Sequence, residues 1–152
     1  MPAVKIFDDV ANKLLEAELD LENVTITMSL VTAAWTPDVG DTAGNINTHE
    51  VTASGYVAQT VSGETGTGVF KISGATGFYC APATFAQNAD AGFTDARYAV
   101  LHTEADLATS GAVPLVYVDL EQDRGNQAGD LTIEFDGNGK VFDLTIPANA
   151  VN

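Results

Sequence analysis

Apolar residues recur along the chain at two different spacings, and each spacing predicts a type of element. Near the N-terminus they follow a helical spacing, with polar and charged residues between them, at Val4, Phe7, Val10, Ala11 and Leu14. This pattern predicts one amphipathic helix over about residues 3–18. From residue 24 onwards the pattern changes to short alternating runs, which are typical of half-buried strands.

The clearest alternation places a threonine or serine between successive members of the series Val24, Ile26, Met28 and Leu30. Further strands are predicted at about residues 55–61, 69–72, 98–102, 115–120, 131–135 and 141–146. The last two flank a Gly-Asn-Gly sequence, so we expect a C-terminal hairpin over about residues 131–146. The segment 78–91 contains Pro82 and many alanines, and we expect it to be irregular.

About seven short strands separated by turn residues favour a mainly β fold. We predict an antiparallel, jelly-roll-like β-sandwich with one short N-terminal amphipathic helix packed on one side. The chain has 152 residues, no internal repeat and no low-complexity tail. We therefore expect a single domain over residues 1–152.

A long segment over about residues 35–54 is rich in Gly, Asp, Thr and Asn. Long ordered loops are often functional surfaces, and a large aromatic such as Trp35 is costly to leave in water. We predict that this loop makes intermolecular contacts. Trp35, His49 and Phe7 are the candidate interaction residues, and we expect the His49 side chain to be solvated.

Charge narrows the range of partners. The chain has six basic and 21 acidic residues, a formal net charge of −15. Nucleic acid and anionic membrane surfaces are therefore disfavoured as partners. The N-terminus carries acidic residues where a signal peptide would have an apolar run, and no segment approaches the ~20 apolar residues that span a bilayer. We expect a soluble product made in the cytoplasm.

Motifs for catalysis are absent from the sequence. There is no Gly-x-Ser-x-Gly elbow or phosphate loop, and the glycines at 63, 66 and 68 lack the dinucleotide-binding spacing. His49 and His102 fall in no metal-ligand pattern, and we predict that His102 is a partly buried structural residue. Cys80 is the only cysteine, so no internal disulfide can form, and we expect a buried apolar role for it. We predict that the protein is not an enzyme and needs no cofactor.

One acidic cluster is a weak candidate for a metal site. Asp119, Glu121 and Asp123 stand two residues apart, and alternate carboxylates can converge on Ca²⁺. The helix–loop–helix calcium motif requires glycine at its sixth position and glutamate at its twelfth. Counting from Asp119, the chain has Arg124 and Asp130 there. A solvated acidic hairpin loop is the favoured interpretation.

Three segments, in this order, resemble a family of structural proteins from the virions of tailed bacteriophages. The segments are FDDVANKLLEAELDLENVTITMSLV (Phe7–Val31), VPLVYVDL (Val113–Leu120) and AGDLTIEFDGNGKVFDLTI (Ala128–Ile146). The stretch ARYAVLHTEADLATSGAVP, between the first two, resembles the family's central strand and loop. Members of this family are head-decoration or minor structural proteins with an N-terminal helix and a C-terminal β-hairpin. Residues 33–95 are longer and richer in Gly and Ala than the family pattern.

The resemblance implies a non-enzymatic capsid decoration or cement protein that binds and stabilises the assembled head. Its partner would be the major capsid protein, and it would be made in the host cytoplasm and end in the virion. Whether it forms a homo-oligomer on the shell stays open. A tail or baseplate component is the alternative within this class. A carbohydrate- or receptor-binding module is the alternative from another class, with Trp35 as the aromatic candidate for sugar stacking.

Overall fold

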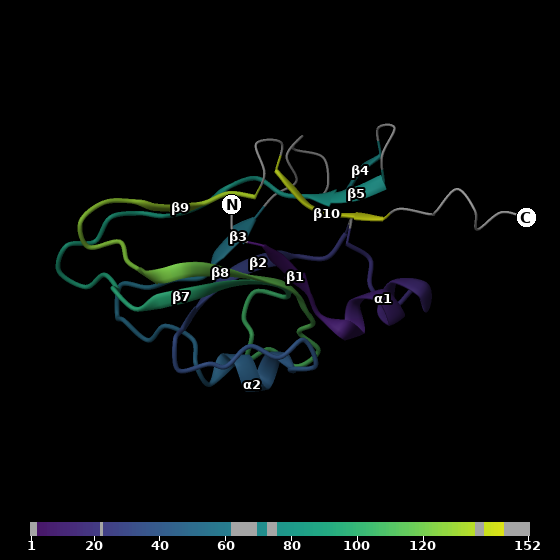
Figure 1. The fold of residues 1–152 in the computed structure, drawn as a ribbon, viewed down its shortest axis with the longest axis horizontal. Helices are drawn as coiled ribbons and strands as arrows, with labels where there is room; N and C mark the ends of the chain where they lie inside the picture. The colour runs from purple at the N-terminus through teal and green to yellow at the C-terminus, as the bar shows by residue number, and fades with distance from the viewer. Residues whose placement is uncertain (1–2, 22, 62–69, 73–75, 136–138, 145–152) are drawn as a thin grey trace, which may run out of the picture.

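The computed structural model describes residues 3–21, 23–61, 70–72, 76–135 and 139–144, which form mainly antiparallel strands with two short helices (Figure 1). The predicted mainly β fold is therefore confirmed. The helices are α1 (Asp8–Leu15) and α2 (Ala43–Asn47). The strands are β1 (Val4–Ile6), β2 (Ile26–Thr32), β3 (Gln59–Val61), β4 (Phe70–Ile72), β5 (Thr76–Tyr79), β6 (Ala83–Phe85), β7 (Ala96–Thr103), β8 (Pro114–Arg124), β9 (Leu131–Ile133) and β10 (Lys140–Leu144).

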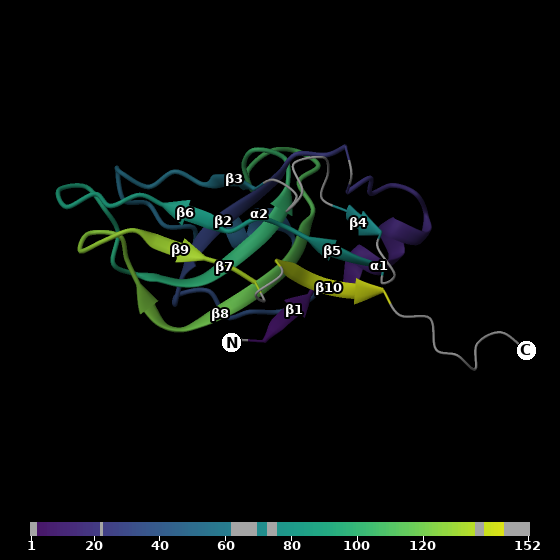
Figure 2. The ribbon, with the colours of Figure 1, turned by 90° about the horizontal axis from the view of Figure 1, so that it is seen from above.

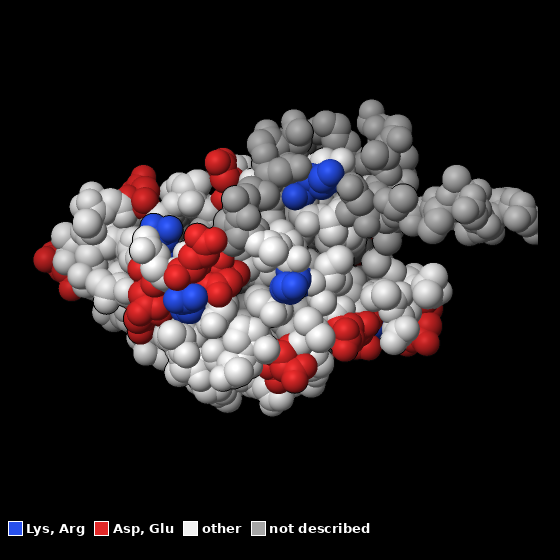
Figure 3. All heavy atoms as spheres, viewed as in Figure 1, with Lys and Arg blue, Asp and Glu red and all other residues white. Residues whose placement is uncertain are grey.

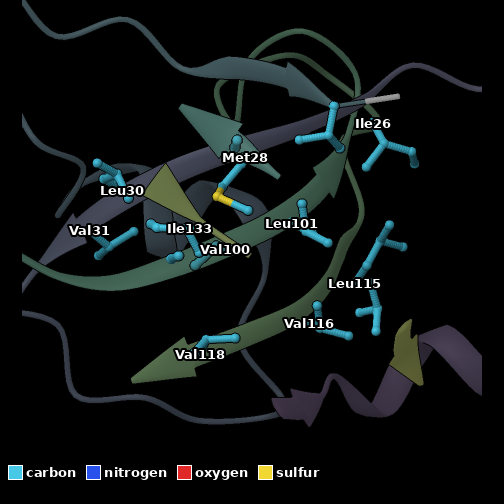
Figure 4. Close-up of a cluster of buried hydrophobic side chains, with 14 of the residues drawn as sticks. Ile26, Met28, Leu30, Val31, Val100, Leu101, Leu115, Val116, Val118 and Ile133 are labelled. Atoms are coloured by element: carbon cyan, nitrogen blue, oxygen red, sulfur yellow. The ribbon is translucent and has the colours of Figure 1, made fainter. Parts of the chain in front are cut away.

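A five-stranded antiparallel sheet, in the order β1-β8-β7-β2-β3, forms the first layer. Its core-facing residues pair across neighbouring strands, as Met28, Leu101 and Val116 do in adjacent registers (Figure 4). The strands β10-β5-β4 and β6-β9 form two smaller sheets that lie over this face (Figure 1). The result is a sandwich-like arrangement with the buried apolar residues in one cluster between and around the layers.

Along β2 the other face of the large sheet is also buried. On β2, Ile26, Met28 and Leu30 point toward the second layer, and the intervening Thr27 and Ser29 are fully buried as well. The helix α2 lies on the side of the sheet opposite the second layer (Figure 1). The alternation had predicted a half-buried strand, but the 35–54 segment covers the polar face.

The predicted C-terminal hairpin is wrong. β9 pairs with β6 through Leu131↔Phe85, and β10 pairs with β5 through Lys140↔Tyr79. The Cys80 amide also donates to the Gly139 carbonyl at 2.9 Å. The chain after Leu131 therefore runs antiparallel to the β5–β6 segment, pairing first with β6 and then with β5. It does not fold back on itself as a hairpin. The tip of the expected turn, residues 136–138, lies outside the described residues.

The segment 78–91 was expected to be irregular, but it contains the end of β5 and all of β6, the strands with which β10 and β9 pair. Its β5 and β6 strands bury Phe78, Ala83 and Phe85. Pro82 lies between the two strands, where a missing backbone donor interrupts no ladder. The short apolar runs on either side of it are too brief to show a period in the sequence.

The N-terminal helix is shorter than predicted, because the first residues form a strand. β1 pairs with β8, and the Phe7 amide donates to the Leu115 carbonyl at 3.0 Å. Phe7 is then the N-cap of α1, with extended backbone. Asp8 and Asp9 in the first turn favour a helix start here through the helix dipole. α1 lies at one end of the molecule and not on a sheet face (Figure 1).

Candidate functional site

An apolar groove opens between the two layers on the side where β1 and β9 are edge strands. Figure 2 shows β1, β9 and β10 along this same side of the molecule. The groove has a volume of about 360 Å³. Its apolar lining comes from β1, β8 and the β9 segment: Val4, Val118, Leu120, Leu131, Ile133 and Phe135. Three segments that are distant in the sequence, β1, β8 and the β9 segment, therefore form one surface.

The rim of the groove is charged, with Glu121, Arg124 and Glu134. Figure 3 views this side of the molecule and shows basic atoms interspersed with acidic ones. Glu121 has a φ of 67°, in the left-handed region that non-glycine residues rarely adopt. Its amide donates to the Asp119 carboxylate at 2.7 Å, which holds the bend in β8 in place.

A second hollow lies on the opposite face of the large sheet, on the same side of the molecule. It has a volume of about 450 Å³ and is bordered by Lys5, Pro37, Tyr98, Tyr117 and Asp119, among others. The two tyrosines are half-buried, and their rings meet edge to face, with centroids 6.4 Å apart. Tyrosine combines large contact area with a polar end and is common at protein interfaces.

The buried Trp35 ring packs against both of these tyrosines. Its ring packs edge-on against Tyr98 at 5.2 Å and Tyr117 at 5.3 Å, and its indole N–H donates to Asp41 at 2.9 Å. Trp35 is only 3% exposed. The expectation that Trp35 is an exposed aromatic, ready for a partner or a sugar, is therefore wrong. The half-buried Tyr98 and Tyr117, and not Trp35, are the aromatic rings that border the hollow.

The other two candidate interaction residues also differ from the expectation. Phe7 is 1% exposed and packs against Tyr117 and Trp35, so it cannot contact a partner unless the core opens. His49 is half-buried, with its carbonyl accepting from the Thr32 amide at 3.0 Å. Its side chain borders a shallow surface hollow between α2 and Trp35.

The carboxylates of the candidate calcium site do not converge. The Arg97 guanidinium binds both oxygens of Asp119, at 2.7 and 3.1 Å, and these bonds hold the pKa of that carboxyl below its usual range. Glu121 and Asp123 are exposed on a strand that continues to Arg124, so the expected hairpin loop is wrong here too. Among the described residues, no group of three or more His, Cys, Asp or Glu side chains is placed to hold a metal ion.

A buried polar pair, Ser29 and His102, lies beneath the 35–54 segment. His102 Nδ1 lies 2.9 Å from the Thr103 carbonyl, which can only accept, so the ring donates there. Its Nε2 then accepts from the Ser29 hydroxyl at 3.0 Å. Burial lowers the pKa of His102 and keeps the ring neutral. The pair has the composition of a nucleophile and a base, but both side chains are fully buried, so a substrate cannot reach the hydroxyl.

Next to this pair, Tyr56 ties the 35–54 segment to β2. Its hydroxyl donates to Glu50 at 2.8 Å and accepts from the Leu30 amide at 2.8 Å. Burial raises the pKa of Glu50. Neither residue was predicted from the sequence, since an isolated glutamate in a long loop and a lone tyrosine beside it carry no pattern. Cys80 is fully buried as predicted, and burial raises the pKa of its thiol to about 12.

Comparisons with known proteins identify no relative: no family model, curated protein or solved structure matches the chain. Neither of the helices in the described ranges has the length and apolar composition needed to cross a bilayer.

Proposed function

We propose that the protein is a structural protein of a bacteriophage virion, a capsid decoration or cement protein that binds the assembled head. The observation that supports this proposal is the composition of the apolar groove. Val118 and Leu120 belong to the phage-like segment Val113–Leu120, and Leu131, Ile133 and Phe135 belong to the phage-like segment Ala128–Ile146. The segments that carry the resemblance thus meet at one partly open apolar surface.

Such a surface suits a protein partner. Fully burying one Val, Leu, Ile or Phe side chain is worth about 1.5–3 kcal/mol, so even partial cover of the groove favours binding. A protein that binds the assembled shell more tightly than its free subunits stabilises the shell by mass action. The charged rim adds orientation more than affinity.

Sedimentation of the chain with empty shells of the phage's major capsid protein tests the proposal. We expect the chain to pellet with the shells at high copy number, close to a fixed ratio per shell subunit, and to raise the temperature at which the shells fall apart. Leu131→Ser, in the groove, should weaken this binding. Leu15→Ser is the matched control, because Leu15 is 87% exposed on α1 and does not line the groove.

Other stoichiometries would contradict the proposal. A few copies bound only on tailed particles would indicate the tail or baseplate component. Equal binding by the Leu131→Ser and Leu15→Ser variants would remove the groove from the contact. No binding to shells or particles would overturn the structural role.

A second candidate, a carbohydrate-binding module, is favoured by the half-buried Tyr98 and Tyr117. Their rings border one hollow together with Lys5 and the Asp119 carboxylate, a combination of apolar surface and a few polar groups that suits a small ligand. Calorimetric titration with host surface glycans tests this role. Heat released by the parent and lost in Tyr117→Ala, with shell binding absent, would favour it over the decoration role.

A further inference from the structure

The outer edge of β1 presents main-chain groups that no other strand in the described structure takes up. β1 pairs only with β8, in the register Val4↔Val118 and Ile6↔Val116. The Phe7 amide donates to the Leu115 carbonyl, so this pair is one of the hydrogen-bonded pairs between β1 and β8. In an antiparallel pair the bonded residues alternate, so Lys5 bonds to β8 and the amides and carbonyls of Val4 and Ile6 point outward.

The side chains of these same two residues lie on the groove side of the sheet. Val4 lines the groove, and Ile6 is 42% exposed, one of the few large apolar side chains on the surface of the described structure. Directly opposed residues share a face, and the partners Val118 and Val116 are buried against the second layer. Lys5 points to the opposite face. A strand added to β1 would therefore place alternate side chains over the groove.

The second layer leaves an edge on the same side. Within the described ranges β9 pairs with β6 alone and β10 with β5 alone, so each stands at the edge of its sheet. Figure 2 shows them running along the side on which β1 lies. The groove is thus bounded by β1 and β8 of one layer and by the β9 segment of the other, with Ile133 and Phe135 among its lining residues.

We propose that β1 accepts an extended segment of a partner protein as a sixth strand of the large sheet. The segment would be apolar at alternate residues, which enter the groove, and would carry a basic residue beside Glu121 or Glu134 at the rim. This inference deepens the proposed function, because it rests on a protein partner and states how that partner is held. Main-chain bonds would give affinity, and the groove would select the side chains.

Two occupants of the β1 edge are conceivable, a segment of a partner protein and a second copy of this chain, and net charge favours the first. The net charge of −15 makes two copies repel each other, whereas a basic segment is attracted. The shortness of β1 and the lysine at its centre are features that protect edge strands from indiscriminate pairing. The outward main-chain groups of Val4 and Ile6, which no described strand takes up, act together with the apolar groove, so a strand without the alternate apolar residues would bind poorly.

A synthetic peptide tests the inference without any shell. The probe has about ten residues, alternating valine and threonine with a lysine at each end, long enough to cover β1 with flanks. The control peptide has the same composition with the valines and threonines in separate blocks. We expect the alternating peptide to slow amide hydrogen exchange at Val4 and Ile6 and to shift the NMR signals of Val118 and Ile133. The Lys5 amide, already bonded, should be protected with or without the peptide.

A pair of variants at one position separates main chain from side chain. Ile6→Pro removes the outward amide and leaves the Lys5 bonds to β8 intact, and proline is tolerated on the free side of an edge strand. Ile6→Ala shortens the side chain but keeps the amide. We expect Ile6→Pro to bind the alternating peptide roughly tenfold more weakly than Ile6→Ala, about the effect of one lost hydrogen bond.

Each other result overturns the inference. Peptide binding without protection of Val4 and Ile6, or equal binding by Ile6→Pro and Ile6→Ala, would exclude strand addition. Protection that rises with protein concentration in the absence of peptide would identify a second copy as the occupant. No binding of the alternating peptide would also refute it. A chain that binds the peptide but no shell would contradict the proposed function and leave strand addition standing, so the two failures are distinguishable.

Discussion

At the scale of single residues, the hydrogen bonds of polar side chains in the core show how neighbouring segments are held together. Thr27, Ser29 and His102 are fully buried, and each has a hydrogen-bond partner: Thr27 donates to the Glu104 carbonyl at 2.7 Å. Buried polar groups cost free energy unless they are paired, and none of the described buried side-chain atoms lacks a partner. These bonds fix how the 103–104 turn and β7 sit against β2.

The burial of His102 predicts how the free energy of unfolding depends on pH. Its folded-state pKa is lowered by burial, so below the ordinary value near 6.5 the unfolded chain binds a proton that the folded chain does not. The free energy of unfolding should therefore fall as the pH drops below about 6.5. The raised pKa of Glu50 acts in the opposite direction, stabilising the fold at low pH and losing that contribution as the pH rises.

The comparison of two chains isolates the histidine. In His102→Gln the Glu50 contribution is retained and the histidine contribution is gone. Urea unfolding at pH 7.5 and 5.5 should show the stability advantage of the parent over His102→Gln shrinking at the lower pH. An unchanged difference between the two chains would mean that His102 does not resist protonation in the folded state.

A second residue-scale prediction contrasts two apolar residues of the N-terminal region. Phe7 is 1% exposed, whereas Leu15 is 87% exposed. Phe7→Ala should lower the free energy of unfolding by about 3–5 kcal/mol, through lost burial and the cavity left behind. Leu15→Ala should change it by less than about 0.5 kcal/mol. Equal melting of Phe7→Ala and the parent would show that the N-terminal segment is a free arm.

At the scale of elements, the main surprise is the path of the last strands. Alternation and a glycine-rich turn predicted that residues 131–135 would pair with 141–146. Instead β9 pairs with β6, about fifty residues earlier in the sequence, and β10 pairs with β5, more than sixty residues earlier. The pairing buries Phe78, Phe85 and Ile133 against the large sheet, which a free-standing hairpin could not do.

This pairing can be tested by a disulfide. Thr84 and Thr132 are exposed, directly opposed residues of β6 and β9 whose hydroxyls lie 3.0 Å apart. A Thr84→Cys, Thr132→Cys double variant should form an intramolecular disulfide in the native state and gain about 2–4 kcal/mol of stability. Cys80 should not compete, because it is buried. Oxidation only after unfolding would contradict the β6–β9 register.

At the scale of the whole molecule, basic side chains border both hollows on the side where β1 lies. Lys5 and Arg124 border the two hollows described above, and Arg97 lies beside them, bonded to Asp119. Several basic side chains therefore lie on the side of the molecule seen in Figure 3, mixed with acids. The groove is lined mainly by apolar residues and its rim carries both signs of charge, so we expect apolar burial to drive docking and the acidic rim residues to orient a basic segment.

The corresponding prediction concerns salt. If apolar burial drives shell binding, raising sodium chloride from about 50 to about 500 mM should leave occupancy unchanged or increase it, although the Debye length shortens roughly threefold. Occupancy is measured by titrating the chain onto emptied particles at each salt concentration. Loss of binding across this range would show that ion pairs hold the chain on the shell.

Features that depend on local pattern could be predicted from the sequence alone. The alternation of β2, the apolar runs of β7 and β8, the helical spacing around Val10 and the burial of Cys80 all follow from side-chain period and polarity. They predicted a mainly β chain with one N-terminal helix, because period and polarity act over a few residues. The exact helix start was missed, since the strand β1 exists only through its bonds to β8.

Strand pairing and the exposure of individual residues became known only from the folded chain. Trp35 and Phe7 looked available in a loop and a helix, but the tyrosines and the sheet cover them. The groove joins residues 4, 118–120 and 131–135, which no local pattern connects. Pairing between distant strands is set by the burial that it achieves across the whole core, and that burial is a property of the folded chain rather than of any short segment.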